Sequence, residues 1–250
     1  MKRTLLIGLL WLAGSLSSVA EEPGKGSVSI TAIEPVSLVT GGVRTLKIRG
    51  FKLKEATELR FPEAPGVTAV IKEKKDATQP KGLENKVAGD CQLLAEITLP
   101  AELPASVLKF VVAVPSGDVH GSVHLVDQER VLEEIEPNNG FRETCKLPLG
   151  KVVRGEFQGE RDVDVYEWQA TAGRKLKIRA IGGGSLLMDP MIQCYDANGQ
   201  FLAASDDAEA RDPSLEFTPR HAGPIFICLT DAHDMGGEWH SYLLTVEPVE

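Results

Sequence analysis

Three groups of acidic and amide side chains in the second half of the chain have types and spacing suited to cation binding. They are Glu134, Glu136, Asn138 and Asn139; Asp162 and Asp164; and Asp206, Asp207 and Asp212. Calcium takes about six to eight oxygen ligands from carboxylates, amides and backbone carbonyls. Alternate residues of an extended segment point the same way, so Glu134 and Glu136 can share one ion, as can Asp162 and Asp164.

The same residues have a second interpretation as turn caps on an acidic surface. Asp and Asn at turns accept hydrogen bonds from their own backbone two residues on. The chain contains no EF-hand loop and no RTX-type nonapeptide, so spacing alone does not prove an ion site. The sequence leaves calcium binding and turn capping both open.

No signature of a catalytic centre accompanies these groups. The chain lacks a GxSxG elbow, an HExxH motif, a phosphate-binding GxxxxGK[ST] loop and a CxxC pair. His120 and His124 share one face of an expected strand, and His233 and His240 occupy a glycine-rich loop. Either pair could hold a transition metal, but a plain strand and an exposed loop are the favoured interpretations. We therefore expect a protein that is not an enzyme.

The charge of the chain is unevenly distributed. The 250 residues carry 27 basic and 36 acidic side chains, a net charge of -9. Residues 21–132 hold 14 basic and 15 acidic side chains, whereas residues 133–250 hold 11 and 21. An acidic chain lacks the electrostatic footprint of a nucleic-acid binder, so we expect no nucleic-acid partner.

The N-terminus has the pattern of a signal peptide. Lys2 and Arg3 precede an uncharged stretch over residues 4–20, and Ser18 and Ala20 are small residues suited to cleavage before Glu21. The apolar part, residues 5–13, is shorter than the roughly 20 residues that span a bilayer. We therefore expect residues 1–20 to be removed, no stable membrane span, and a secreted or periplasmic protein.

The remaining chain alternates apolar and polar residues with the period of β-strands. Examples are residues 108–114, 164–170, 175–180 and 241–246, and Gly and Pro punctuate the chain between such runs. This pattern predicts an all-β protein of two β-sandwich domains in tandem after a cleaved signal peptide, at residues 21–132 and 133–250. The polar segment 72–90 is expected to form a long exposed loop.

The second half resembles a known family. The matching segments, in order, are residues 134–139 (EIEPNN), 153–157 (VRGEF), 162–168 (DVDVYEW), 172–176 (AGRKL), 195–199 (YDANG), 205–207 (SDD), 222–226 (AGPIF) and 242–246 (YLLTV). Together they resemble the bacterial pre-peptidase C-terminal domain, a secreted β-sandwich appended to many extracellular hydrolases. The resemblance implies a binding or accessory role. Residues 21–132 carry no peptidase signature, so we expect the family name to imply no activity here.

The resemblance also implies a ligand set. Related collagen-binding domains of secreted proteases carry a calcium site at such an acidic N-terminal segment. By this similarity the candidate metal ligands are Glu134, Glu136, Asn138, Asp162 and Asp164. The first half resembles an immunoglobulin-like (IPT/TIG-type) domain shared with plexins and transcription factors, through Pro35, Gly41-Gly42 and residues 46–51 (LKIRGF).

Cysteines and aromatic residues complete the expectations. Cys194 and Cys228 fall on opposite faces of their strands, which argues against a disulfide between them. We expect these two cysteines, and also Cys91 and Cys145, to be buried free thiols. Tyr166, Trp168 and Phe217 are expected in the core. Trp239, in the loop that holds His240, either stacks on a carbohydrate or packs beneath that loop.

These features favour a secreted, non-catalytic binding or accessory protein at the cell envelope or outside the cell, with an extracellular polysaccharide or protein as its partner. A structural module of a surface assembly is the alternative, followed by a hydrolase with an unrecognised site.

Overall fold

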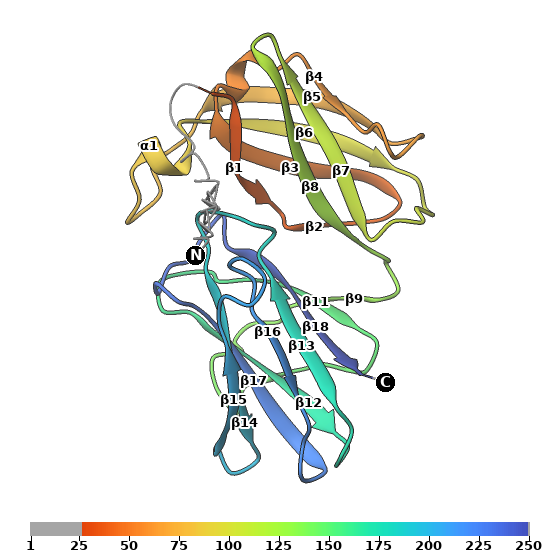
Figure 1. Cartoon of the computed structure of the whole chain (residues 1–250), viewed down its shortest axis with the longest axis vertical. Coiled ribbons are helices and arrows are strands. Elements are labelled where there is room, and N and C mark those ends of the chain that lie inside the picture. The colour runs from red at the N-terminus through yellow and green to blue at the C-terminus, as the bar shows by residue number, and fades with distance from the viewer. Residues whose placement is uncertain (1–26, 250) are drawn as a thin grey trace, which may run out of the picture.

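The structure, a computed structural model, describes residues 27–249. The predicted signal peptide, residues 1–20, lies outside the described residues. The described chain is all-β, with four sheets arranged as two sandwiches that lie end to end (Figure 1). The prediction of two tandem β-sandwiches is thus confirmed.

The first sandwich pairs two four-stranded sheets, with strand orders β1-β3-β6-β5 and β2-β8-β7-β4. The strands are β1 (Ser29–Glu34), β2 (Ser37–Val39), β3 (Gly42–Phe51), β4 (Glu58–Arg60), β5 (Thr68–Asp76), β6 (Cys91–Leu99), β7 (Val107–Val114) and β8 (Gly117–Val126). Alternation places Leu46 and Ile48 of β3 in the core against Phe110 and Val112 of β7, all buried. A 3-10 turn, η1 (Leu53–Glu55), and a short helix, α1 (Asn85–Ala88), interrupt the strands.

The prediction of a long loop over residues 72–90 is wrong for about half of its length. Residues 72–76 belong to β5, which pairs with β6 up to Asp76 and Cys91, and residues 85–88 form α1. The polar composition misled because β5 is an edge strand whose last residues are exposed on both faces. Edge strands commonly carry lysines that discourage further strand pairing.

The second sandwich pairs two five-stranded sheets, with orders β10-β12-β17-β14-β15 and β16-β13-β18-β11-β9. The strands are β9 (Val131–Glu133), β10 (Cys145–Lys146), β11 (Val152–Glu156), β12 (Val163–Ala170), β13 (Leu176–Ile181), β14 (Pro190–Asp196), β15 (Phe201–Ser205), β16 (Ser214–Phe217), β17 (Gly223–Asp231) and β18 (Ser241–Pro248). The predicted core residues Tyr166 and Trp168 are buried, and Phe217 packs against the same cluster. The boundary predicted between residues 132 and 133 falls within β9, which pairs with β11.

The two sandwiches are joined by a bonded and packed interface. The backbone N–H of Leu186 donates to the carbonyl of Thr31 on β1, at 2.8 Å. The hydroxyl of Ser241 accepts a bond from the Val36 N–H and donates to the Glu34 carboxylate. Trp239, 6% exposed, lies among Ala32, Ala88, Leu187 and Leu83 from both sandwiches.

Trp239 is therefore an interface residue, and the carbohydrate-stacking interpretation of this side chain is wrong. The guanidinium of Arg49, itself buried, lies 5.8 Å from the centre of the Trp239 ring. Four acceptors from the 78–89 segment satisfy the Arg49 donors, namely the carbonyls of Thr78, Ala88 and Gly89 and the side chain of Asn85. The loop holding α1 and the second sandwich are thus anchored to the same arginine.

Candidate metal site

The candidate site is built where the segment after β9 meets β12 and β18 of the second sandwich. After β9 the chain remains extended, and the Glu134 N–H donates to the carbonyl of Arg154 on β11, at 2.9 Å. The carbonyl of Asn138 accepts the N–H of Val165 on β12, at 2.8 Å. These two bonds place residues 134–138 along the side of the second sandwich. β12 contributes Asp164 and Tyr166, and β18 contributes Tyr242.

Three carboxylates converge at this point. Glu134, Glu136 and Asp164 each offer an oxygen, and these oxygens all lie within 4.8 Å of one another. Asp164 is 0% exposed, as is the neighbouring Asn138. Within residues 27–249, none of the three carboxylates lies within 4.0 Å of a basic side-chain nitrogen in an ion pair. Buried charges of this kind are costly unless a cation or hydrogen bonds compensate them.

Two oxygens at the site have no hydrogen-bond partner. They are Asn138 Oδ1 and Asp164 Oδ1, each fully buried. The other polar atoms of these side chains are occupied: Asn138 Nδ2 donates to Glu134 Oε1 at 2.8 Å, and Asp164 Oδ2 accepts from the Tyr242 hydroxyl at 2.6 Å. Buried polar atoms are nearly always paired, so each exception requires an explanation, such as an ion or a water. Both unpaired atoms are hard oxygen donors, which suit an alkaline-earth cation.

The tyrosine hydroxyls provide too few protons for the contacts around them. The Tyr166 hydroxyl lies 2.5 Å from Glu134 Oε1 and 2.6 Å from the Tyr242 hydroxyl. The Tyr242 hydroxyl is in turn 2.9 Å from Glu134 Oε1 and 2.6 Å from Asp164 Oδ2. Each hydroxyl carries one proton, so two protons serve four close oxygen pairs. The cluster therefore holds excess negative charge that an added proton or a metal cation would neutralise.

The pKa values of the carboxyl and hydroxyl groups at this site are raised by burial and by neighbouring negative charge. Burial, followed by the charge of Glu134, raises the pKa of Asp164 to about 8. Burial also raises the pKa of Glu136. The pKa values of the Tyr166 and Tyr242 hydroxyls are raised as well, mainly by burial, so both tyrosines remain neutral donors. The site thus favours positive charge and disfavours any further anion.

Glycine at position 155 makes room for this arrangement. A side-chain carbon at Gly155 on β11 would lie 2.4 Å from the ring and hydroxyl of Tyr242. No real side chain tolerates that distance, so glycine is required for the Tyr242 hydroxyl to reach Asp164. The requirement arises from close packing, since Gly155 has no left-handed backbone conformation.

The structure brings together four of the five candidate ligands. Glu134, Glu136 and Asp164 share one cluster, and Asn138 is bonded to it. Asp162 does not belong to this group, because its carboxylate accepts the backbone N–H groups of Gln158 at 2.6 Å and Val163 at 3.0 Å. It lines an open groove of about 820 Å³ together with Glu136. Turn capping, the second interpretation, accounts for Asp162 and for one oxygen of Glu136, which accepts the Asn138 N–H.

The third acidic group is assembled differently from its prediction. Asp206 and Asp207 meet Asp189, whereas Asp212 instead accepts the N–H of Gly182 at 2.8 Å. Asp189 lies just before β14 and reaches the other two through the pairing of β14 with β15. The His233 ring lies 3.4 Å from the Asp189 carboxylate, and the charge of Arg211 also acts on Asp189. Asp206 and Asp207 are exposed.

Sequence reasoning missed the hydroxyl roles of Tyr166 and Tyr242. Both were recognisable as inward positions of alternating strands, and the short Asp164–Tyr166 spacing on one face was a usable signal. The cysteine prediction is confirmed, because Cys91, Cys145, Cys194 and Cys228 are all buried and unpaired. In register, Cys194 lies opposite Ile227 and Cys228 opposite Gln193, so the two thiols face opposite sides of their sheet.

Comparison with known proteins yields similarities of structure only. No protein-family model and no curated protein sequence matches the chain. The pre-peptidase C-terminal domain of a Bacillus anthracis collagenase is similar over 46% of this chain and all of its own length, with 14% identity and a TM-score of 0.35. The secreted serine protease VesC of Vibrio cholerae is similar over 91% of this chain and 51% of its own, with 11% identity and a TM-score of 0.27.

Within residues 27–249, no helix has the length and apolar character needed to cross a bilayer.

Proposed function

We propose that this chain is an exported, non-catalytic binding or accessory protein whose second sandwich carries a structural calcium site. The observation that supports the site is the pair of buried, unpartnered oxygens on Asn138 and Asp164, beside the carboxylates of Glu134 and Glu136. Its proposed ligands are those four side chains, whereas Asp162, the fifth predicted ligand, lines the adjoining groove and caps the backbone of Gln158 and Val163.

The donor chemistry selects the ion. All proposed ligands are oxygens, with no thiolate or imidazole among them, which favours calcium or magnesium over zinc or copper. Calcium accepts irregular arrangements of mixed carboxylate and amide oxygens and can complete its shell with water, whereas magnesium demands near-ideal octahedral geometry. A calcium ion here would neutralise the excess negative charge between residues 134–138 and β12.

The proposed role follows from the position of the site. Residues 134–138 follow β9 within the second sandwich and lie against β11 and β12, so an ion bound there would hold this segment onto the sandwich. The proposed partner of the exported protein is an extracellular polysaccharide or protein.

Isothermal titration calorimetry of calcium into the purified, chelator-treated chain tests the site. We expect saturable binding near one ion per chain, lost in Asp164→Asn and retained in Asp206→Asn. Absence of heat at millimolar calcium, together with an unchanged melting temperature, would contradict the proposal.

A further inference from the structure

The sheet edges of the molecule differ in how well they are protected. Four sheets have eight edge strands: β1, β2, β4, β5, β9, β10, β15 and β16. An edge strand presents unpaired N–H and C=O groups that another strand can use, and proteins block such edges with charge, shortness or cover. Each of the eight edges can be judged by these criteria.

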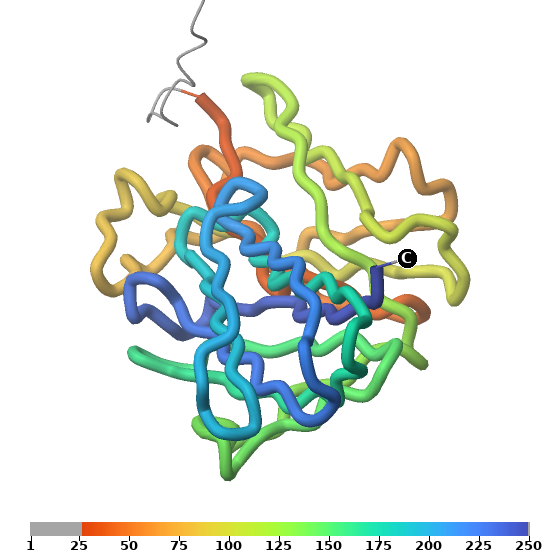
Figure 2. Tube along the Cα trace, turned by 60° about the horizontal axis from the view of Figure 1, so that its bottom comes forward, coloured from red at the N-terminus to blue at the C-terminus, as the bar shows by residue number. Residues whose placement is uncertain are grey.

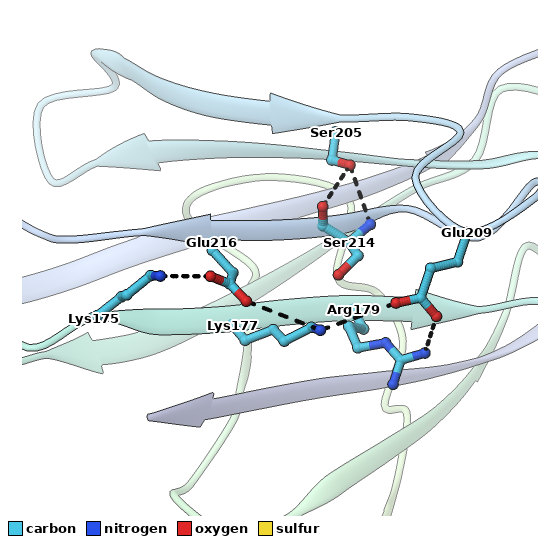
Figure 3. A network of polar contacts seen from close by, with 7 residues as sticks. All are labelled: Lys175, Lys177, Arg179, Ser205, Glu209, Ser214 and Glu216. Carbon is cyan, nitrogen blue, oxygen red and sulfur yellow. Dashed lines mark hydrogen bonds and ion pairs between the residues drawn. The ribbon is translucent and has the colours of Figure 1, made fainter. Parts of the chain in front are cut away.

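Seven edges are blocked. β2, β4, β9 and β10 have two or three residues each. β1 is covered by the second sandwich through the Leu186–Thr31 bond. β5 carries Lys72, Lys74 and Lys75. β16 has four residues, and its Glu216 pairs with Lys175 at 2.6 Å in a charged row that continues to Glu209 and Arg179 (Figure 3).

β15 is the exception. It has five residues, Phe201–Ser205, and none is charged. It pairs with β14 on one side and is the last strand of its sheet on the other. Phe201 is 60% exposed and Leu202 41% exposed. Only the end of the strand is attached elsewhere, where the Ser205 hydroxyl bonds the backbone of Ser214 on β16, at 3.0 and 3.1 Å (Figure 3).

A cleft opens beside the unattached part of β15. Its volume is about 660 Å³, and its walls include Phe201, Leu202 and Phe217, with Gln200 and Arg220 as polar groups. The hairpin of β14 and β15 lies at the end of the molecule away from the first sandwich, and it comes forward in Figure 2. The two sheets are thus joined at Ser205 and separated at Phe201.

Aromatic side chains extend from this edge over the outer face of the sheet. Phe201 contacts Tyr195, Tyr195 contacts Phe141, and Phe141 stacks on Phe226 with ring centres 4.6 Å apart. Phe141 is 41% exposed. A strand added beside β15 would place alternate side chains against this aromatic row and its other side chains in the cleft.

We propose that the free edge of β15 and the adjoining cleft bind an extended, basic peptide segment of a partner protein as an added strand. An uncharged edge with unpaired backbone groups is complementary to another polypeptide backbone, and alternate pockets give specificity for its side chains. The basic character follows from charge. Asp196 lines the cleft and Asp206 and Asp207 directly follow β15, against the single Arg220 of the cleft, and residues 133–250 as a whole carry 21 acidic and 11 basic side chains. This inference rests on the proposed binding role and specifies the class of partner.

The test uses phage-displayed random peptides of about 12 residues, selected on the purified chain in calcium. We expect enriched peptides that are basic and alternate apolar residues. Their affinity should fall roughly tenfold or more in the double variant Leu202→Lys/Ala204→Lys, which installs the lysine protection seen on β5. The matched control is Val70→Lys, an exposed apolar residue on the already protected β5, which should change affinity less than about twofold.

A second measurement separates strand addition from other contacts. In the best peptide, alternate backbone N–H groups would donate hydrogen bonds to β15. Methylation of these nitrogens should weaken binding about tenfold, whereas methylation of the nitrogens that point away from β15 should not. Peptides that bind the double variant as well as the original chain would overturn the proposal. So would an absence of enrichment, a dimer that the double variant dissociates, or selective binding in a glycan screen. A preserved calcium-dependent thermal shift in the double variant shows that it is folded and that the calcium proposal stands independently.

Discussion

Two acidic clusters of three carboxylates on one sandwich differ in burial and in the charges around them. In the Glu134 cluster the Asp164 side chain is fully buried, two oxygens have no partner, and no ion pair of the described residues reaches it. The Asp189 cluster also has one buried oxygen without a partner, Asp189 Oδ1, but its other two carboxylates are exposed, and His233 and the charge of Arg211 lie beside Asp189. Neither charge density nor a single unpaired oxygen therefore distinguishes a cation site from a solvated surface; the number of buried oxygen ligands and the nearby basic side chains do.

The largest difference is expected when the buried carboxylate is neutralised. At calcium a hundredfold above its Kd, an ion that binds only the folded state adds about 2.7 kcal/mol of stability, a rise of roughly 5–10 °C in Tm. Asp164→Asn should abolish this rise. In chelator the variant should be no less stable than the original chain, because it removes a carboxyl group whose ionisation is opposed by burial. Differential scanning fluorimetry with and without calcium measures both effects.

Asp206→Asn is the matched control for that experiment, since it neutralises one carboxylate of the other cluster. The rise in Tm with calcium should persist unchanged in this variant. Equal losses in the two variants would show that calcium acts through general charge screening and would remove the distinction between the clusters.

Displacing a tyrosine from the buried cluster should have the next largest effect. In Gly155→Ala the new carbon would overlap the Tyr242 ring, so the ring must move away from Asp164 and Glu134. We expect a loss of about 1–3 kcal/mol in unfolding free energy, typical of overpacking, together with weaker calcium binding. Urea unfolding and calorimetry measure the two losses.

Gly159→Ala serves as its control. A carbon added there meets nothing within 4 Å, although the residue lines the groove beside Glu136. It should leave stability and calcium affinity almost unchanged. If Gly155→Ala retained full calcium affinity despite its stability loss, the tyrosine network would have no part in the site.

Much of this arrangement could be predicted from the alternation of apolar and polar residues. Period-2 patterning identified the strands, the core positions of Tyr166 and Trp168, and the opposite faces of Cys194 and Cys228. It also placed Glu134 and Glu136 on a single extended segment. All these are consequences of local backbone geometry.

The features that the sequence did not predict depend on contacts between residues that are far apart in the chain. Asp189 replaces Asp212 in its cluster because β14 pairs with β15, which no local pattern specifies. Trp239 is buried because two sandwiches dock over it, and Asp162 bonds to backbone because of the turn before β12. The sequence of edge strand β5 resembles that of a loop. Its last residues are exposed on both faces, so they lack the apolar–polar alternation that marks a half-buried strand.

A half-buried carboxylate at the interface between the sandwiches, that of Glu34, is expected to give a smaller and pH-dependent effect. Burial raises the pKa of Glu34 from 4.5 to about 7. Between these values the folded chain holds a proton that the unfolded chain has released, so stability falls as pH rises through this window. One pKa unit corresponds to about 1.4 kcal/mol, and partial exposure reduces the total to on the order of 2 kcal/mol.

Glu34→Gln isolates this contribution while keeping an acceptor for the Ser241 hydroxyl. Urea unfolding at several pH values in chelator should show similar stabilities at pH 4.5. At pH 8 the variant should be more stable by on the order of 2 kcal/mol. Parallel pH profiles for the two proteins would show that Glu34 ionises equally easily in the folded and unfolded chains.

The smallest effect is expected at the exposed cluster itself. Because Asp206 and Asp207 are exposed and their carboxylates lie within 4.8 Å of that of Asp189, their repulsion is weakened by solvent and salt. Asp207→Asn should therefore raise stability by only about 0.2–0.5 kcal/mol at low ionic strength, comparable to other exposed charge pairs. The gain should vanish in roughly 0.5 M sodium chloride. The same substitution should leave calcium binding unchanged, because the exposed carboxylates are already hydrated and have an arginine and a histidine nearby. A stability gain that persists in high salt would mean that this cluster is desolvated like the one at Asp164, and the contrast between the two would then rest on geometry alone.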